Sequence, residues 1–164
     1  MSLDSGPERG VDGTRPVTPD GNRQIAAADV PWVEQGEGVW FKPFRLSIEQ
    51  GMWANLLKVA AGGLVSRHRH HGPVEAWVLQ GRWKYLEHGL LAGPGSYVHE
   101  PEGDVHTLVV EPDEEMITFF LVHGAIDYLD EEGNVIRTDT AQRKLELYQA
   151  HCRKHGIEPL DLAY

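Results

Sequence analysis

The chain has 164 residues, of which 41% are hydrophobic, and this is enough for one domain with its own core. It carries 25 acidic and 15 basic side chains, a formal charge of −10, so we expect neither nucleic acid nor an anionic membrane as a partner. Its one cysteine, Cys152, excludes an intrachain disulfide and a cysteine-based zinc cluster. The sequence shows no apolar run of membrane-spanning length and no secretory signal pattern, which predicts a cytoplasmic protein.

The first two segments of the chain differ in composition. Residues 1–25 are rich in Gly, Pro and polar residues without apolar periodicity, which predicts a flexible N-terminal arm. Residues 26–125 instead hold short apolar runs separated by glycine-containing turns, and this pattern predicts an all-β sandwich or barrel. The expected strands cover residues 39–46, 53–60, 75–79, 82–86, 95–98, 105–110 and 116–122.

A hairpin and a helix are expected after the barrel, over residues 126–164. The acidic turn at 130–134 joins two short apolar runs, as in a β-hairpin. Asp139 or Thr140 can cap the helix that follows, and Gly156 ends it. One apolar stripe predicts that the helix packs against the outside of the barrel: Ala141, Leu145, Tyr148 and Cys152.

Three histidines form a candidate metal site. His68 and His70 are separated by one residue, and alternate residues of a strand point to the same face, so both imidazoles can reach one ion. His106 follows a proline-glycine turn, which can aim its ring into the barrel from another strand. Three imidazoles leave coordination positions open, and an open site favours catalysis over a purely structural role.

The two stretches that carry these histidines resemble the signature motifs of the cupin superfamily. They read GGLVSRHRHHGPVEAWVLQG from Gly62 and GSYVHEPEGDVH from Gly95. The resemblance implies a single double-stranded β-helix, or jelly-roll barrel. Where the family has a glutamate ligand, this chain has Val74, and Glu75 fits only if the strand shifts its register. We therefore expect a three-histidine centre without a carboxylate ligand.

A closer resemblance covers roughly residues 60–155. The segments HRHHGPVEAWVLQGRWKYLE, EPEGDVHTL, VHGA and DEEGNV look like those of 2,4'-dihydroxyacetophenone dioxygenases. Those enzymes are single-barrel cupins with three histidines and non-haem iron, and acetylacetone-cleaving dioxygenases are a related case. The resemblance implies an Fe(II)-dependent enzyme that uses O2 to cleave a C–C bond of a small hydroxyketone, aromatic or aliphatic, or of a diketone. Zn, Ni or Mn can replace iron in a purified sample.

Several residues near the motifs are weaker candidates. Glu75 is a candidate general base or orienting partner of an imidazole. Trp77 and Tyr85 are candidates for lining an aromatic-substrate pocket. The resemblance to the dioxygenases makes His123 a third candidate for this pocket. A larger group is interpreted as surface or rim residues: His71, His99, Glu100, Glu102 and Asp104.

Two alternatives to the dioxygenase remain at the level of the sequence. One is another metal-cupin enzyme, such as a Mn- or Zn-dependent isomerase or a quercetinase-like oxygenase. The other is a non-enzymatic module that senses a metal or ligand and regulates a partner. In each case we expect a homodimer, because the segment from Val30 to Leu46 can add a strand to the sheet edge of a second copy.

Overall fold

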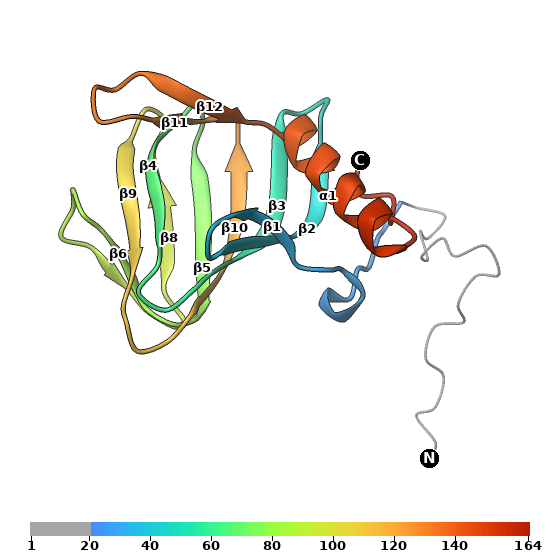
Figure 1. Ribbon diagram of the computed structural model, residues 1–164, viewed down its shortest axis with the longest axis horizontal. Helices are drawn as coiled ribbons and strands as arrows, with labels where there is room; N and C mark the ends of the chain where they lie inside the picture. The colour runs from blue at the N-terminus through green and yellow to red at the C-terminus, as the bar shows by residue number, and fades with distance from the viewer. Residues whose placement is uncertain (1–20) are drawn as a thin grey trace, which may run out of the picture.

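Two antiparallel sheets form the fold, as shown by a computed structural model that describes residues 21–164 (Figure 1). The strand order of the first sheet is β1-β2-β3-β10-β5-β8, and that of the second is β12-β11-β4-β9-β6-β7. The first sheet contains β1 (Val33–Gly36), β2 (Val39–Ser47), β3 (Met52–Val59), β5 (Val74–Gln80), β8 (Tyr97–Glu100) and β10 (Met116–His123). The second contains β4 (Leu64–His70), β6 (Trp83–Tyr85), β7 (Leu91–Ala92), β9 (Val105–Val110), β11 (Ile126–Leu129) and β12 (Val135–Asp139). A 3-10 turn, η1 (Ala27–Asp29), precedes them, and the helix α1 (Ala141–His155) follows.

The predicted all-β jelly roll with a C-terminal helix is confirmed, and side-chain alternation explains why these residues form strands. Along β10, buried and half-buried residues alternate without a break. The buried set faces the second sheet and includes Thr118, whose Oγ1 accepts a hydrogen bond from Trp83 Nε1 at 3.0 Å. The two inner faces therefore share one core between the sheets.

The segment after residue 125 is more closely joined to the barrel than an appended hairpin. Strand β11 pairs with β4 through Ile126 opposite His70 and Tyr128 opposite His68, so it belongs to the second sheet. The helix α1 begins after Thr140, whose Oγ1 accepts a hydrogen bond from the backbone N–H of Arg143 at 3.1 Å.

The helix lies beside β1, β2 and β3 and packs mainly against β1 and β2 (Figure 1). Its buried residues are Ala141, Lys144, Tyr148 and Cys152, and the half-buried Leu145 also packs against the core. Residues 1–20 of the predicted arm lie outside the described part of the chain. Of the last five arm residues, which are described, Ile25 packs against the core.

Candidate metal centre

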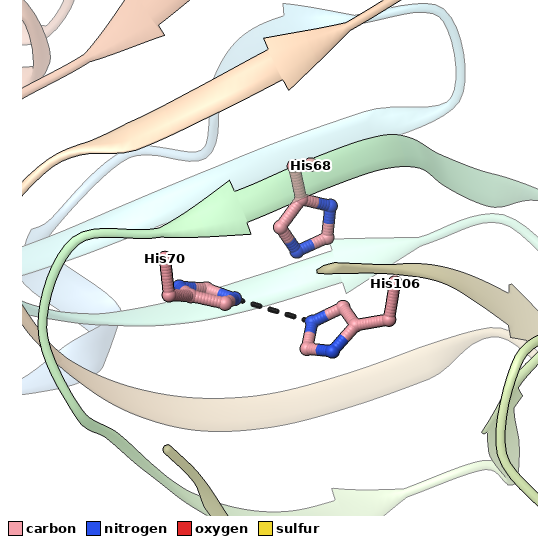
Figure 2. Close-up of side chains that lie close together, drawn as sticks. All are labelled: His68, His70 and His106. Carbon is pink, nitrogen blue, oxygen red and sulfur yellow. Dashed lines mark hydrogen bonds between the residues drawn. The ribbon is translucent and has the colours of Figure 1, made fainter. Parts of the chain in front are cut away.

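Strand geometry brings the three predicted histidines together from two neighbouring strands. His68 and His70 both project inward from β4, where buried residues alternate with the half-buried Arg69. The pairing of β4 and β9 sets His68 directly opposite His106, after an irregularity between Val65 and His68. The same inward alternation on β9 buries the His106 ring. Figure 2 shows the three side chains pointing toward one another.

The imidazole nitrogens are close enough to share one ion. Each of the three residues offers a ring nitrogen, and these nitrogens lie within 4.8 Å of one another. Nε2 of His70 lies 3.1 Å from Nε2 of His106 (Figure 2). His68 is 5% exposed, His70 3% and His106 1%, so water does not solvate the rings freely.

Burial favours the neutral form of His68 and His106, and neutral imidazole is the form that binds a metal. Burial, reinforced by the neighbouring His70 and His106, lowers the pKa of His68 to about 3. Burial also lowers the pKa of His106, although Glu100 and Asp104 oppose this effect. Nδ1 of His70 is buried and has no hydrogen-bond partner among residues 21–164. A cluster of buried imidazole nitrogens facing one another fits a divalent transition-metal ion.

Hydrogen bonds fix the orientation of two of the rings. Nδ1 of His68 donates to the backbone oxygen of Ser66 at 2.7 Å, and Nδ1 of His106 donates to Oδ2 of Asp104 at 2.9 Å. The other oxygen of Asp104 lies 3.2 Å from Nε2 of His88. Partners of this kind leave Nε2 with a free lone pair for the metal. The interpretation of Asp104 as a surface charge is therefore wrong: it is half-buried and holds a metal-ligand candidate.

Glu100 is a candidate site residue that the sequence interpretation missed. It was assigned to the surface, yet it is 3% exposed at the end of β8. Its Oε2 lies 2.9 Å from Nε2 of His70 and 3.6 Å from Nε2 of His106. Strand alternation with the buried Val98, two residues earlier, is the signal that could have revealed it.

Tyr85 supports this carboxylate. Its hydroxyl donates to Oε1 of Glu100, and its ring stacks on the ring of His106 with centroids 4.0 Å apart. Burial and the neighbouring carboxylate raise the pKa of Tyr85, so the hydroxyl remains a donor. Burial alone would raise the pKa of Glu100, but the hydrogen bond from His70, the nearby His106 and the hydrogen bond from Tyr85 lower it. The structure thus places an anionic carboxylate against the histidines.

Three other predicted site residues lie away from the centre. Glu75 and Trp77 alternate along β5 with the buried Val74 and Ala76, so their side chains occupy the opposite, outward face of the sheet. Trp77 is 41% exposed and contacts the rings of two other outward residues, Tyr97 and Phe119. His123 has the same outward parity at the end of β10. None of the three lines the cavity beside the histidines.

That cavity has a volume of about 50 Å³ and is bounded by both sheets and by α1. Its wall includes His68, His70, Glu100 and Val74, and also Lys144 from the helix. The valine confirms that an apolar side chain stands where cupins have a glutamate. Residues lining both this cavity and a larger outer hollow of about 520 Å³ are Gln35, Val65 and Tyr128.

Comparison with known families agrees with this architecture. Residues 21–127 match the family described as the ChrR cupin-like domain. The chain belongs to this family. No curated protein matches this cupin. No helix in residues 21–164 has the length and apolar character needed to cross a membrane.

Solved structures extend the comparison. The cupin is similar to an RmlC-like cupin protein from Ralstonia eutropha JMP134, with 32% identity and a TM-score of 0.80 over 87% of this chain and 94% of that chain. An acetylacetone dioxygenase from Acinetobacter johnsonii shares the fold, with 20% identity and a TM-score of 0.70 over 84% of this chain and 96% of that chain. The structure of Rhodobacter sphaeroides SigE in complex with the anti-sigma ChrR matches with 26% identity and a TM-score of 0.50, over 59% of this chain and 50% of that chain.

Proposed function

We propose that this cupin is a metal-dependent dioxygenase that cleaves a C–C bond of a small hydroxyketone or diketone with O2. The observation that carries the proposal is a set of three buried imidazoles, two of which line the cavity, next to a carboxylate that is positioned by its own hydrogen bond. Because the three imidazoles bring no charge, a divalent ion held by His68, His70 and His106 keeps its full positive charge. When bound, Fe(II) would supply Lewis acidity toward two chelating oxygens and the electrons needed to react with O2.

Glu100 is well placed to move a proton at this cavity. Its carboxylate lines the cavity, and Tyr85 holds Oε1 in place, which leaves Oε2 toward the histidines. We infer that Oε2 takes a proton from the substrate and so generates the electron-rich enolate. In a diketone this proton is on the carbon between the two carbonyl groups, and in a hydroxyketone it is on the carbon that carries the hydroxyl group. A hydroxyketone plus O2 would give two carboxylic acids, and a diketone plus O2 would give a carboxylic acid and an α-ketoaldehyde, with both oxygen atoms retained in the products.

The apolar side chains of the cavity exclude water and limit the size of the substrate. Val74, Leu108, Phe120 and Val122 line it, and it is a small cavity, with a volume of about 50 Å³. This space favours a small dicarbonyl compound over 2,4'-dihydroxyacetophenone, which the sequence resemblance suggests. The fold shared with an acetylacetone dioxygenase supports the same preference.

Oxygen consumption tests this function. Anaerobically iron-loaded protein is mixed with acetylacetone or 2,4'-dihydroxyacetophenone, and O2 uptake is compared with the carboxylic acid formed. We expect equal amounts of both, loss of activity in His106→Ala, and a fall of about 10²-fold or more in Glu100→Gln. Exposed His99 gives a matched control, since His99→Ala should keep full activity. Full activity in Glu100→Gln would refute the base, and no uptake with iron bound and a range of diketones would refute the dioxygenase.

A regulatory module is the second candidate, and the match to the ChrR family is the observation that favours it. The SigE–ChrR structure shows a relative engaged with a sigma factor. A metal-dependent change in the affinity of this cupin for a partner protein, together with no O2 uptake, would support regulation over catalysis. An isomerase would instead convert its substrate without consuming O2.

A further inference from the structure

Lys144 is a buried cation at the wall of the cavity, although the sequence predicts only a packing role for its helix. The residue is 4% exposed on the face of α1 that contacts the barrel. Its ammonium group lies 4.6 Å from the centre of the Phe41 ring and 5.9 Å from that of Trp53. Trp53 and Lys144 line the same cavity as His68 and His70. Burying an ammonium group is costly, so its place at this cavity calls for a compensating partner.

The acidic partner of Lys144 is shared with two other cations. Oδ2 of Asp139 lies 3.4 Å from Nζ of Lys144, while Oδ1 lies 3.2 Å from Nε of Arg137 and 3.1 Å from Nε of Arg143. Three positive charges therefore surround one carboxylate. The two arginines are partly exposed and so are screened by water, whereas the Lys144 side chain is only 5% exposed. In a chain with a formal charge of −10, this cluster is a local positive region next to the cavity.

Hydrogen bonding leaves capacity on the ammonium group. Gln35 Oε1 accepts one of its hydrogens, and Asp139 is placed to accept a second. An ammonium group has three donors, so the acceptors offered by residues 21–164 account for two of them. Gln35 also belongs to the wall between the cavity and the outer hollow. An incoming anion would meet Lys144 beside that wall.

We propose that Lys144 selects a substrate that carries a carboxylate, which it binds while the dicarbonyl end of the same molecule faces His68 and His70. This inference rests on the proposed function, and it narrows the substrate class to small dicarbonyl acids. Burial lowers the pKa of Lys144 to about 8, and Arg137 and Arg143 add to the effect while Asp139 opposes it. The ammonium form is therefore available at neutral pH, and a bound carboxylate would stabilise it further.

A matched pair of probes tests the selection without turnover. Acetopyruvate and acetylacetone share the same dicarbonyl unit, and only the former adds a carboxylate. Their dissociation constants are measured by calorimetry at pH 7 with the zinc-loaded protein, because zinc has no redox chemistry and the probes are not consumed. The variants are Lys144→Met, which removes the charge at similar size, Lys144→Arg, which keeps it, and Lys154→Met as an exposed control on the same helix.

We expect the wild-type protein to bind acetopyruvate about tenfold or more tightly than acetylacetone, the gain of one charge-assisted hydrogen bond. Lys144→Met should bring the ratio close to one, while Lys154→Met should keep it and Lys144→Arg should keep part of it. Equal affinities in the wild type, a preference that survives in Lys144→Met, or no binding of either probe would overturn the proposal. The ratio of the two dissociation constants in the wild-type protein tests the proposal even if a variant fails to fold. Failure of the dioxygenase function is seen separately, as absence of O2 uptake by iron-loaded protein with a probe that binds.

Discussion

Asp104 should set the metal affinity of the centre without touching the ion. Its Oδ2 accepts from His106 Nδ1 at 2.9 Å, and its side chain is 22% exposed whereas that of His106 is 1% exposed. Burial alone would raise the pKa of Asp104, but its bonds with His106 and His88 lower it, so the carboxylate is ionised. A buried charged hydrogen bond is worth about 1.5–3 kcal/mol, and partial exposure argues for the lower end. Asp104→Asn keeps an acceptor without the charge, so we expect about tenfold weaker metal binding, or about 1.4 kcal/mol.

A competition titration against a chromophoric chelator measures this change for Zn(II) at pH 7. Asp104→Ala removes the acceptor as well and should approach a 100-fold loss, or about 2.7 kcal/mol. The control is Glu102→Gln, which changes an exposed carboxylate of the same turn and should leave the affinity unaltered. If Asp104→Asn and Asp104→Ala both bind zinc as tightly as the wild type, the hydrogen bond to His106 does not orient the ligand and this reasoning fails.

Three further predictions concern stability and assembly. Burial lowers the pKa of Lys144 from its ordinary value of 10.5 to about 8 in the folded protein, so the unfolded chain binds more protons between these values and stability should rise there by about 3 kcal/mol in total. Urea unfolding at pH 7.5 and 9.5 should show about 2 kcal/mol of this rise in the wild type and not in Lys144→Met; the same rise in both would disprove it. Gly81 has φ +73°, and an added Cβ would fall on the backbone oxygen of Glu115, so Gly81→Ala should cost more than about 2 kcal/mol, against less for Gly133→Ala, whose Cβ meets nothing. Equal unfolding midpoints for the two alanine variants would contradict that. Finally, we expect light scattering to give twice the 18.4 kDa chain mass; a monomeric wild type at micromolar concentration would exclude the dimer.

The fold could be predicted because each strand carries its own signal. Short apolar runs between glycine turns predict the strands, and the structure has strands over all of them, with small shifts at their ends. Two strands gave weaker signals. The first is β1 (Val33–Gly36), where Val33 is the one large apolar residue, and the second is β7 (Leu91–Ala92), which is too short to show alternation.

The histidine set could be predicted from spacing, whereas its charged neighbours could not. His68 and His70 share a face by strand alternation, and His106 meets them because β9 pairs with β4. Glu100 and Lys144 are charged, and a charged residue is normally exposed, so the sequence favours the surface for both. Lys144 does lie three residues after Ala141 and four before Tyr148, so helical periodicity placed it on the buried face. Only the tertiary structure supplies the partners that make such burial tolerable.

Metal stoichiometry tests the three-histidine centre most directly. Purified protein is stripped with a chelator, titrated anaerobically with Fe(II) and analysed for bound metal, beside the variants His68→Ala, His70→Ala, His106→Ala and His99→Ala. The account predicts one tightly bound ion per chain in the wild type and in His99→Ala, and loss of that tight binding in each of the other three. One tightly bound ion with unchanged affinity in all three of those variants would contradict it.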